Sequence, residues 1–517
     1  MWYSVRMEYR DLVLPPDIKG AHVHFVGIKG TGMAALVEIL FARGAVITGS
    51  DVSERFYTDE ILERLGIPVL GFSGDNITDS VQYVIYSSAY NPEKNPDLIA
   101  AGKKKIPMLL YTQALGEISA SVFSCGICGV HGKTTTTGLA GTILRALDLP
   151  SQVLAGSMIA SFGSSCTMTS PSFDKDRPYY FVAETCEYQR HFMSFCPGMI
   201  LLTSVESDHQ DYYPTYESIR DAFVDYVCKL PAGGVLIYCA DDDGAREVMS
   251  LAVRKRSDIR TVGYGESADG DYKLTFVNTA AAEQTNGRQL FNLQAAGDIA
   301  LVVPGRHNAL NAAGAVALCN ELLLKSGRNP GDCKETVRKA LLEFTGGKRR
   351  SEVIARTETP LGESLIVLDD YAHHPTAIKS TLRGYREFYG GRRIVVDFMS
   401  HTYTRTSALL DDFASSFESA DDVFINKIYA SAREDASSAD VSGEILSERA
   451  AMHKSGVKFC KEFDEAAAEI SRLISGPSGD EFPCGWLLVT MGAGDNWKVG
   501  RMVLDSIASA GKNSHTE

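Results

Sequence analysis

The chain has 517 residues, of which 44% are hydrophobic and 22% are charged. A chain of that length rarely folds around a single hydrophobic core, so about three domains are expected. The composition excludes a largely disordered protein. The 51 basic and 65 acidic residues give a net charge of −14. This acidic balance argues against a protein that wraps nucleic acid or lies on an anionic membrane, although a local basic pocket is compatible with it.

Neither a leader nor a membrane anchor is expected. The first 19 residues mix charged and apolar side chains, unlike a signal peptide, and no apolar run reaches the ~18–20 residues of a membrane span. The eleven cysteines are scattered through apolar stretches, as in a cytoplasmic protein with reduced thiols. Cys125 and Cys128 have the spacing of a redox or zinc pair, but they fall in an expected strand, which favours a core position.

The first block is predicted to be a βαβ unit. Strands are expected at 21–28 and Val46–Asp51, with a helix over Met33–Ala42 between them. The turn Gly27–Gly32 resembles a dinucleotide fingerprint, with Lys29 at the middle glycine and the strand-end Asp51 placed for a ribose contact. Spacing alone leaves two interpretations, a nucleotide diphosphate site and a structural turn.

The second block opens with a strand near Val122–Cys128, a glycine loop and a helix over Thr134–Leu147. Between about Val262 and Val303 the alternating, turn-rich pattern predicts antiparallel strands. Further buried strands are expected at Tyr179–Ala183, Met199–Val205 and Val235–Tyr238, and helices at Asn308–Leu324 and Asp332–Phe344.

The loop Gly129–Thr134 is a predicted phosphate site. Its backbone N–H groups and the following helix N-terminus suit phosphate oxygens, an exposed Lys133 would neutralise charge, and the Thr134 hydroxyl would hold Mg²⁺. The loop is shorter than the general phosphate-loop pattern, because Ile127 stands where that pattern has its first glycine. The alternative is a glycine-rich turn that caps a helix.

Two strand ends are candidates for a metal site. Glu184 ends one apolar run and His209 closely follows another. The carboxyl ends of parallel strands meet at one edge of a sheet, so both side chains are expected to face the same loop. Mg²⁺ prefers oxygen ligands, which favours Glu184 and makes His209 unusual. Each residue taken alone is also compatible with a solvated strand end.

A third block begins near Gly346. Its expected strands are Leu365–Leu368, Ile394–Phe398, Val423–Ile425 and Trp486–Thr490, while Ala430–Gly443 and the tail after Ser506 are expected to be loops. The fold class is therefore α/β, with domains predicted at 1–119, 120–345 and 346–517.

Several strings together resemble the Mur ligases, which build the peptidoglycan precursor, and within that family the alanine-adding type. They span most of the chain in family order: Gly27–Met33, Gly129–Thr137, Ala183–Tyr188, Arg190–Phe192, Pro304–Asn308 with Asn311, Gly347–Arg350, Asp369–Pro375, Tyr403–Thr406 and Gly492–Asp495.

The resemblance implies three domains. They are an N-terminal Rossmann-like domain for a UDP-sugar, a central P-loop ATPase with a mostly parallel sheet plus a smaller antiparallel one, and a C-terminal Rossmann-like domain for the amino acid. The implied reaction joins L-alanine to the carboxylate of UDP-N-acetylmuramate through an acyl phosphate, with ATP and Mg²⁺. It also implies a role in cell-wall biogenesis, cell shape and division, for a cytoplasmic monomer or homodimer with no nucleic-acid partner and no membrane insertion.

Site residues follow from the same resemblance. Implied catalytic residues are Lys133, Glu184, His209, Arg350, His373, His374 and Arg405. Implied ATP contacts are Gly129, Val130, His131, Gly132, Lys133, Thr134, Thr135, Asn308, Asn311, Arg350 and Asp370. Implied UDP-sugar contacts are Gly27, Lys29, Gly30, Thr31, Gly32, Met33, Asp51, Ser87 and Ser88. Implied metal ligands are Thr134, Glu184 and His209.

The chain departs from the family pattern at two positions. Thr402 stands where arginine is commoner, which leaves Arg405 as the expected carboxylate clamp, and Ser351 stands where an aromatic residue is usual. Three rival functions account for part of the sequence. A related ligase adds a recycled tripeptide to the same sugar; an NAD-dependent dehydrogenase leaves Lys133 unexplained; and a non-catalytic nucleotide-binding regulator would be expected to lack Lys133 or Glu184.

Overall fold

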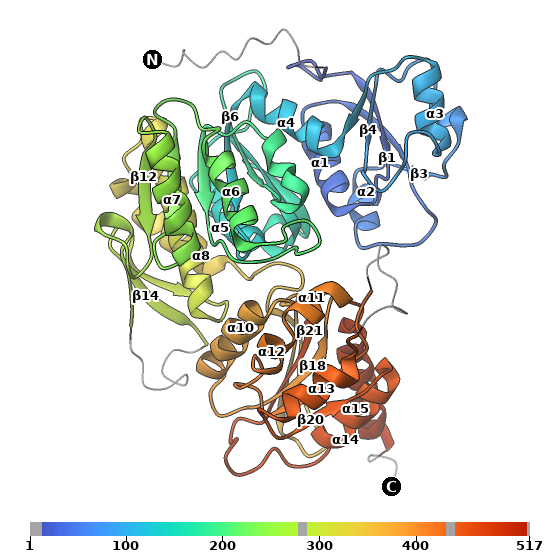
Figure 1. Ribbon diagram of the computed structural model, residues 1–517, viewed down its shortest axis with the longest axis vertical. Helices are drawn as coiled ribbons and strands as arrows, with labels where there is room; N and C mark the ends of the chain where they lie inside the picture. The colour runs from blue at the N-terminus through green and yellow to red at the C-terminus, as the bar shows by residue number, and fades with distance from the viewer. Residues whose placement is uncertain (1–12, 278–286, 431–439, 514–517) are drawn as a thin grey trace.

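The computed structural model describes residues 13–277, 287–430 and 440–513. Three sheet-containing domains follow one another along the chain, with the N-terminal and middle domains side by side and the C-terminal domain below both in Figure 1. The predicted α/β class with three domains is confirmed. The predicted domain limits at residues 119 and 345 stay predictions.

The N-terminal domain is a five-stranded parallel sheet in the order β3-β2-β1-β4-β5. The helix expected from Met33 begins two residues earlier, at Thr31. Its strands are β1 His22–Val26, β2 Val46–Ser50, β3 Val69–Leu70, β4 Tyr83–Tyr86 and β5 Met108–Leu110, and its helices are α1 Thr31–Ala42, α2 Asp59–Arg64, α3 Pro96–Lys103 and α4 Tyr111–Ser121.

The middle domain is a seven-stranded sheet in the order β12-β11-β10-β6-β9-β7-β8, parallel except for the β7–β8 pair. Strand β6 is central and almost wholly buried, as expected of a strand covered on both faces. The strands are β6 Phe123–Cys128, β7 Ser151–Ile159, β8 Ser165–Thr169, β9 Tyr180–Glu184, β10 Met199–Leu202, β11 Val235–Cys239 and β12 Arg260–Tyr264, with helices α5 Lys133–Ala146, α6 Tyr216–Val227 and α7 Asp243–Lys255.

Cys125 and Cys128 lie in β6 and are fully buried, which confirms their predicted core position. Burial raises the pKa of both thiols, so they are poor nucleophiles and poor metal ligands. All eleven cysteines are free.

A small antiparallel sheet completes the middle domain, as the turn-rich pattern predicted. Helix α8 lies between this sheet and the larger one and is buried over most of its length, which explains why its sequence is apolar on nearly every face. The elements are β13 Leu274–Phe276, β14 Gln289–Leu293, β15 Gly297–Leu301, α8 Arg306–Lys325 and α9 Lys334–Glu343.

The C-terminal domain is a six-stranded sheet in the order β16-β17-β21-β18-β19-β20, in which only the edge strand β16 is antiparallel. Its strands are β16 Glu352–Glu358, β17 Ser364–Asp370, β18 Arg393–Met399, β19 Asp422–Ile425, β20 Val457–Phe459 and β21 Trp486–Gly492. Its helices are α10 Pro375–Phe388, α11 Tyr403–Ala408, α12 Leu410–Ala414, α13 Gly443–Ala451, α14 Phe463–Ile474 and α15 Trp497–Asn513.

The expectation of a loop after Ser506 was wrong, because α15 continues to Asn513. Val499, Val503 and Ile507 are buried at four-residue spacing, so a helical apolar stripe carries the segment against the sheet. Most of the loop expected at Ala430–Gly443 lies outside the described residues.

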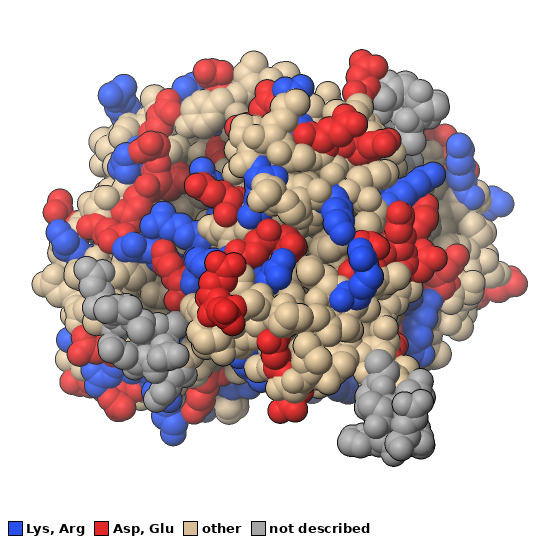
Figure 2. All heavy atoms as spheres, turned by 90° about the horizontal axis from the view of Figure 1, so that it is seen from below, with Lys and Arg blue, Asp and Glu red and all other residues tan. Residues whose placement is uncertain are grey.

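Two surface properties of the described part bear on partners. No helix there is both long enough and apolar enough to cross a membrane. On the face seen in Figure 2, acidic and basic side chains are interspersed.

Candidate active site

The glycine loop between β6 and α5 is held close to the loop after β10. Gly129 has φ of 134° and Gly132 has φ of 79°, conformations that disfavour side chains. A Cβ on Gly129 would collide with Thr203, and one on Gly132 with Asn311. Both positions therefore require glycine, and the backbone at this site is open to a close-fitting ligand.

Lys133, the first residue of α5, is not the exposed residue that the sequence suggested. Its side chain is 14% exposed and its ammonium lies 2.9 Å from Glu187, whose own side chain is 3% exposed. Lys133 also donates to the carbonyl of Gly129 at 2.6 Å. The expectation of exposure was wrong because the carboxylate that covers Lys133 comes from the loop after β9, 54 positions away.

The Lys133–Glu187 pair shifts the pKa of both groups. Burial, the largest single influence, would lower the pKa of Lys133, but the charge and hydrogen bond of Glu187 together with Cys186 and Glu184 outweigh it and the net shift is upward. Burial alone would raise the pKa of Glu187, but Lys133 and His209 outweigh it and the net shift is downward. Both groups are therefore charged at neutral pH.

The predicted metal ligands line one cavity of about 560 Å³ together with the glycine loop. Glu184 ends β9, and one carboxylate oxygen accepts the N–H of Gly156 at 2.7 Å. Thr134 and Glu184 offer the hydroxyl and carboxylate oxygens that Mg²⁺ prefers, so the donor set fits this ion. The Nε2 atom of His209 lies 3.4 Å from Glu187, so its nearest partner is a carboxylate.

Asn308 and Asn311, on the first turns of α8, close the other side of that cavity. Asn308 donates to the carbonyl of Pro304 at 2.7 Å, and Asn311 donates to the side-chain oxygen of Asn308 at 3.2 Å. The pair thus forms a buried, ordered amide surface next to Gly132.

The far wall of the cavity comes from the C-terminal domain. The guanidinium of Arg350 lies 5.2 Å from the ring centroid of Tyr371. Asp370 accepts N–H groups of Ser351 at 2.7 Å and Ala372 at 2.8 Å, so its carboxylate orders the start of the loop after β17. Ser351, where an aromatic residue is usual, therefore helps to position Asp370.

The paired histidines have different surroundings. His373 shares a hydrogen bond of 2.8 Å between its Nδ1 and the carbonyl of Tyr371, and burial, then the charge of Arg405, holds its pKa well below the usual range. His374 is the N-cap residue immediately before α10 and is 4% exposed, and neither ring nitrogen has a hydrogen-bond partner among the described residues.

Arg405 faces the middle domain. Its Nε and Nη2 donate to Asp208 at 3.1 and 2.7 Å, and both side chains are less than a tenth exposed. Burial, the largest single influence, would raise the pKa of Asp208, but Arg405, His209 and His373 together outweigh it and the net shift is downward. Thr402 accepts the N–H of Arg405, so it caps α11 where the family commonly has arginine.

Three acidic residues of this site were not singled out from sequence, namely Glu187, Glu206 and Asp208. Each lies within three positions of a predicted ligand, Glu184 or His209, and that proximity was the available signal. Glu206 forms an ion pair with His131 and accepts the hydroxyl of Thr376 at 2.8 Å.

The first glycine loop lies away from this cavity, in the N-terminal domain. The backbone N–H of Lys29 donates to Asp51 at 2.7 Å, and the Lys29 ammonium lies 3.1 Å from Asp59. Asp51 also accepts the hydroxyl of Tyr90 at 2.8 Å. A ribose contact by Asp51 stays a prediction. In the structure, the Asp51 carboxylate supports the loop through these hydrogen bonds.

The other predicted sugar contacts lie in that loop or beside it. Thr31 and Gly32 begin α1, Met33 is buried in the core, and Gly27 has φ of 84°. Ser87 and Ser88 follow β4, and Ser87 accepts the N–H of Ala89 at 3.3 Å. The loop and the strand end therefore share one edge of the sheet.

Family models match the three domains in turn. The Mur ligase family catalytic domain matches residues 22–122, the Mur ligase middle domain residues 127–319, and the Mur ligase glutamate ligase domain residues 349–493. The chain belongs to the Mur ligase family.

Curated relatives are similar over nearly the whole chain. The UDP-N-acetylmuramate–L-alanine ligase of Treponema pallidum (strain Nichols) is 46% identical over 494 residues, which is 95% of this chain and 98% of that protein. The enzyme of the same name from Borreliella burgdorferi is 34% identical over 480 residues, 92% of this chain and 97% of that one.

Solved structures show the same fold at low identity. The UDP-N-acetylmuramate–alanine ligase of Thermotoga maritima has a TM-score of 0.69 at 24% identity and covers 95% of this chain and 99% of its own. A murein peptide ligase from Psychrobacter arcticus has a TM-score of 0.63 at 21% identity, with 94% and 99% coverage.

Proposed function

We propose that this Mur ligase joins L-alanine to the carboxylate of UDP-N-acetylmuramate at the expense of ATP, which yields ADP and phosphate. The observation that supports it most directly is the 46% identity, over 95% of the chain, to an enzyme named for that reaction. The site is compatible with it, because the glycine loop with Lys133, the oxygen donors of Thr134 and Glu184, and the guanidinium of Arg405 line one cavity.

The chemistry explains the charges of the cavity. A carboxylate becomes an electrophile when its oxygen is phosphorylated by ATP, and the alanine nitrogen then attacks the carbonyl carbon while phosphate leaves. The two anions of the first step must be brought together, so Lys133 has to exchange Glu187 for phosphate oxygens. Mg²⁺ held by Thr134 and Glu184 would add Lewis-acid stabilisation of the phosphoryl oxygens.

The C-terminal wall would bind the amino acid. We assign the alanine carboxylate to Arg405, whose planar fork suits bidentate pairing and which is now occupied by Asp208. His373 is the better of the two histidines for the amine. Its Nδ1 is engaged by the Tyr371 carbonyl, so the neutral ring keeps Nε2 as a hydrogen-bond acceptor.

The nucleotide and the UDP-sugar are assigned to the remaining parts of the site. We assign adenine to the surface of Asn308 and Asn311, phosphates to the loop Gly129–Thr135, and the UDP-sugar to the loop after β1. Arg350 and Asp370 would reach the nucleotide from the C-terminal domain. The place of the reaction in peptidoglycan precursor synthesis, and with it a cytoplasmic location, is part of the same proposal.

The experiment is ADP release by the purified protein with UDP-N-acetylmuramate and one acceptor at a time. We expect L-alanine to support turnover far better than a tripeptide, which is the acceptor of the rival ligase. Preference for a tripeptide would overturn the alanine assignment within the family, and no ADP release with any acceptor would overturn ligation itself.

Magnesium is tested on Glu184. Replacement Glu184→Gln keeps the shape and removes the charge, so the magnesium concentration required for half-maximal turnover should rise. An unchanged magnesium titration would exclude Glu184 as a ligand.

A further inference from the structure

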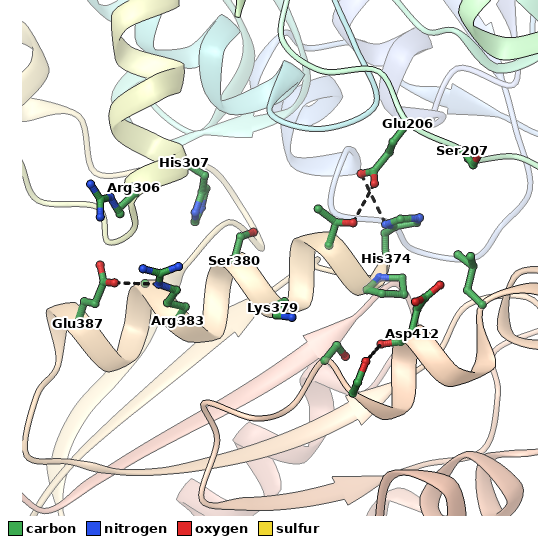
Figure 3. Close-up of a pocket in the computed structure, with 16 residues that line it drawn as sticks. Glu206, Ser207, Arg306, His307, His374, Lys379, Ser380, Arg383, Glu387 and Asp412 are labelled. Carbon is green, nitrogen blue, oxygen red and sulfur yellow. Dashed lines mark hydrogen bonds and ion pairs between the residues drawn. The ribbon is translucent and has the colours of Figure 1, made fainter. Parts of the chain in front are cut away.

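A second group of potential metal-ligand side chains has no member in common with Thr134 and Glu184. His131, Glu206 and His374 place one potential ligand atom each within 4.8 Å of one another. His131 and Glu206 form an ion pair, and Nδ1 of His374 lies 3.7 Å from Glu206. Figure 3 shows Glu206 and His374 pointing toward each other across the boundary between the middle and C-terminal domains.

The surroundings of His374 distinguish this cluster from an ordinary surface ion pair. The side chain is 6% exposed and both ring nitrogens lack a hydrogen-bond partner. A buried imidazole without partners forfeits the hydrogen bonds that it makes in water. An unprotonated imidazole nitrogen has a lone pair available for a metal.

One ligand separation in the cluster is close to that of a tetrahedral ion, whereas the contact between His131 and Glu206 is shorter and would have to lengthen when an ion binds. With ligand bonds of about 2.0–2.1 Å, neighbouring ligand atoms of a tetrahedral zinc ion lie about 3.3–3.5 Å apart. The 3.7 Å separation of His374 and Glu206 is close to that value. The other oxygen of Glu206 accepts the Thr376 hydroxyl at 2.8 Å, which would orient the carboxylate as an outer-sphere partner does.

We propose that His131, Glu206 and His374 form a binding site for a zinc-class transition-metal ion that joins the middle and C-terminal domains. Two imidazoles and one carboxylate select such an ion over Mg²⁺, which prefers oxygen. His131 lies in the loop after β6, Glu206 follows β10, and His374 immediately precedes α10. A bound ion would therefore tie the C-terminal domain to the loop that carries the phosphate site, and a water molecule would supply the fourth ligand.

The test is a titration of the full-length protein with Co²⁺ in excess Mg²⁺. Tetrahedral Co²⁺ absorbs visible light, and Mg²⁺ keeps the oxygen-rich ligands Thr134 and Glu184 occupied. We expect one Co²⁺ per chain, displaced by Zn²⁺. Replacement Glu206→Gln should weaken binding by at least about tenfold, since loss of even an outer-sphere partner costs that much. The control Glu343→Gln, at an exposed position on α9, should bind as wild type.

Two further variants separate this site from its neighbours. His374→Ala should abolish tetrahedral binding, whereas His209→Gln should retain it, since His209 belongs to the other group. The proposal would be overturned if Glu206→Gln and His374→Ala retained tetrahedral Co²⁺ binding, or if His209→Gln lost it. A thiolate-to-cobalt charge-transfer band would also overturn it. If a variant fails to fold, zinc-edge anomalous diffraction from wild-type crystals decides, by a peak among the three side chains or its absence. Metal binding is read without turnover, so failure here leaves the ligase proposal standing.

Discussion

The two glycine loops of this protein share a plan but differ in what surrounds them. Gly27–Gly32 and Gly129–Gly132 each follow a buried parallel strand and precede a helix, and each has a lysine paired with a carboxylate. Lys29 is enclosed by its own domain, where it donates to the Glu54 carbonyl at 2.8 Å and pairs with Asp59. The second loop faces a cavity whose far wall belongs to another domain.

This difference shows that a glycine loop with a lysine has no fixed role. In the first loop, the backbone N–H of Lys29 is already bound to Asp51, so the lysine and its carboxylates stabilise the turn. In the second loop, Glu187 lies beside the cavity, where phosphate oxygens can replace it on Lys133. We therefore expect the two lysine substitutions to differ in catalysis: the change at Lys133 should abolish turnover, whereas the change at Lys29 should act through stability and the sugar site.

The largest effect is expected at Lys133. Replacement Lys133→Ala removes a preorganised charge and should lower turnover by at least ~10²–10³. It also leaves Glu187 buried without its partner, which costs about 3–5 kcal/mol for a fully buried pair. Turnover and urea unfolding of the purified variant measure the two effects.

The double variant Lys133→Met with Glu187→Gln keeps the two effects apart, because it removes both charges. It should recover most of the lost stability and none of the activity. Near-normal turnover in this folded double variant would contradict a phosphate role for Lys133.

A smaller effect is expected at Arg405, on the wall that only the second loop faces. Replacement Arg405→Lys keeps the charge and loses the fork, so the KM for alanine should rise about ten- to a hundredfold while the KM for ATP changes little. Steady-state kinetics with each substrate varied in turn measures this.

The matched variant is Asp208→Asn, which removes the present partner of Arg405 without removing the guanidinium. If Arg405 binds alanine, the two variants should differ in their KM for alanine. Equal rises for all three substrates in both variants would show that the Arg405–Asp208 pair holds two domains together instead.

Substitution of Lys29 should lower stability without the loss of turnover expected at Lys133. Replacement Lys29→Met leaves Asp59 without its ion pair and the Glu54 carbonyl without its donor, so the free energy of unfolding should fall by about 1–3 kcal/mol. The KM for the UDP-sugar should rise and the KM for ATP should not. Lys461→Met, at an exposed position, is the control for loss of a surface charge. A selective rise in the KM for ATP would erase the contrast between the loops.

The smallest effect concerns pH. Lys133 and His209 hold the pKa of Glu187 below its ordinary value of about 4.3 despite its burial. A pKa that is lower in the folded than in the unfolded state stabilises the fold at all pH values above the unfolded-state pKa. This stabilisation is lost as the pH falls below about 4. Urea unfolding across that range should show that the free energy of unfolding falls less steeply with decreasing pH for Glu187→Gln than for wild type. Parallel curves would exclude the Lys133–Glu187 pair as the source of the pH dependence.

The sequence by itself determined the local features of this protein. It gave the α/β class, the three sheets and their order, the antiparallel insert, the position of Cys125 and Cys128 in a strand, and the loop that precedes Lys133. It also predicted that Glu184 and His209 face one loop, and both side chains line one cavity. These features depend on alternation of apolar residues, glycine placement and strand ends, all of which are written within a few neighbouring positions.

Only the tertiary structure decided which side chains meet. Lys133 and Glu187 are 54 positions apart, and Arg405 and Asp208 are 197 positions apart. The cluster of His131, Glu206 and His374 likewise joins loops of two domains. Such pairs depend on how sheets and domains pack, and a carboxylate in a loop has the same local pattern whether it faces water or a buried lysine. The sequence therefore predicted the presence of the site's groups, and packing assigned each charge its partner.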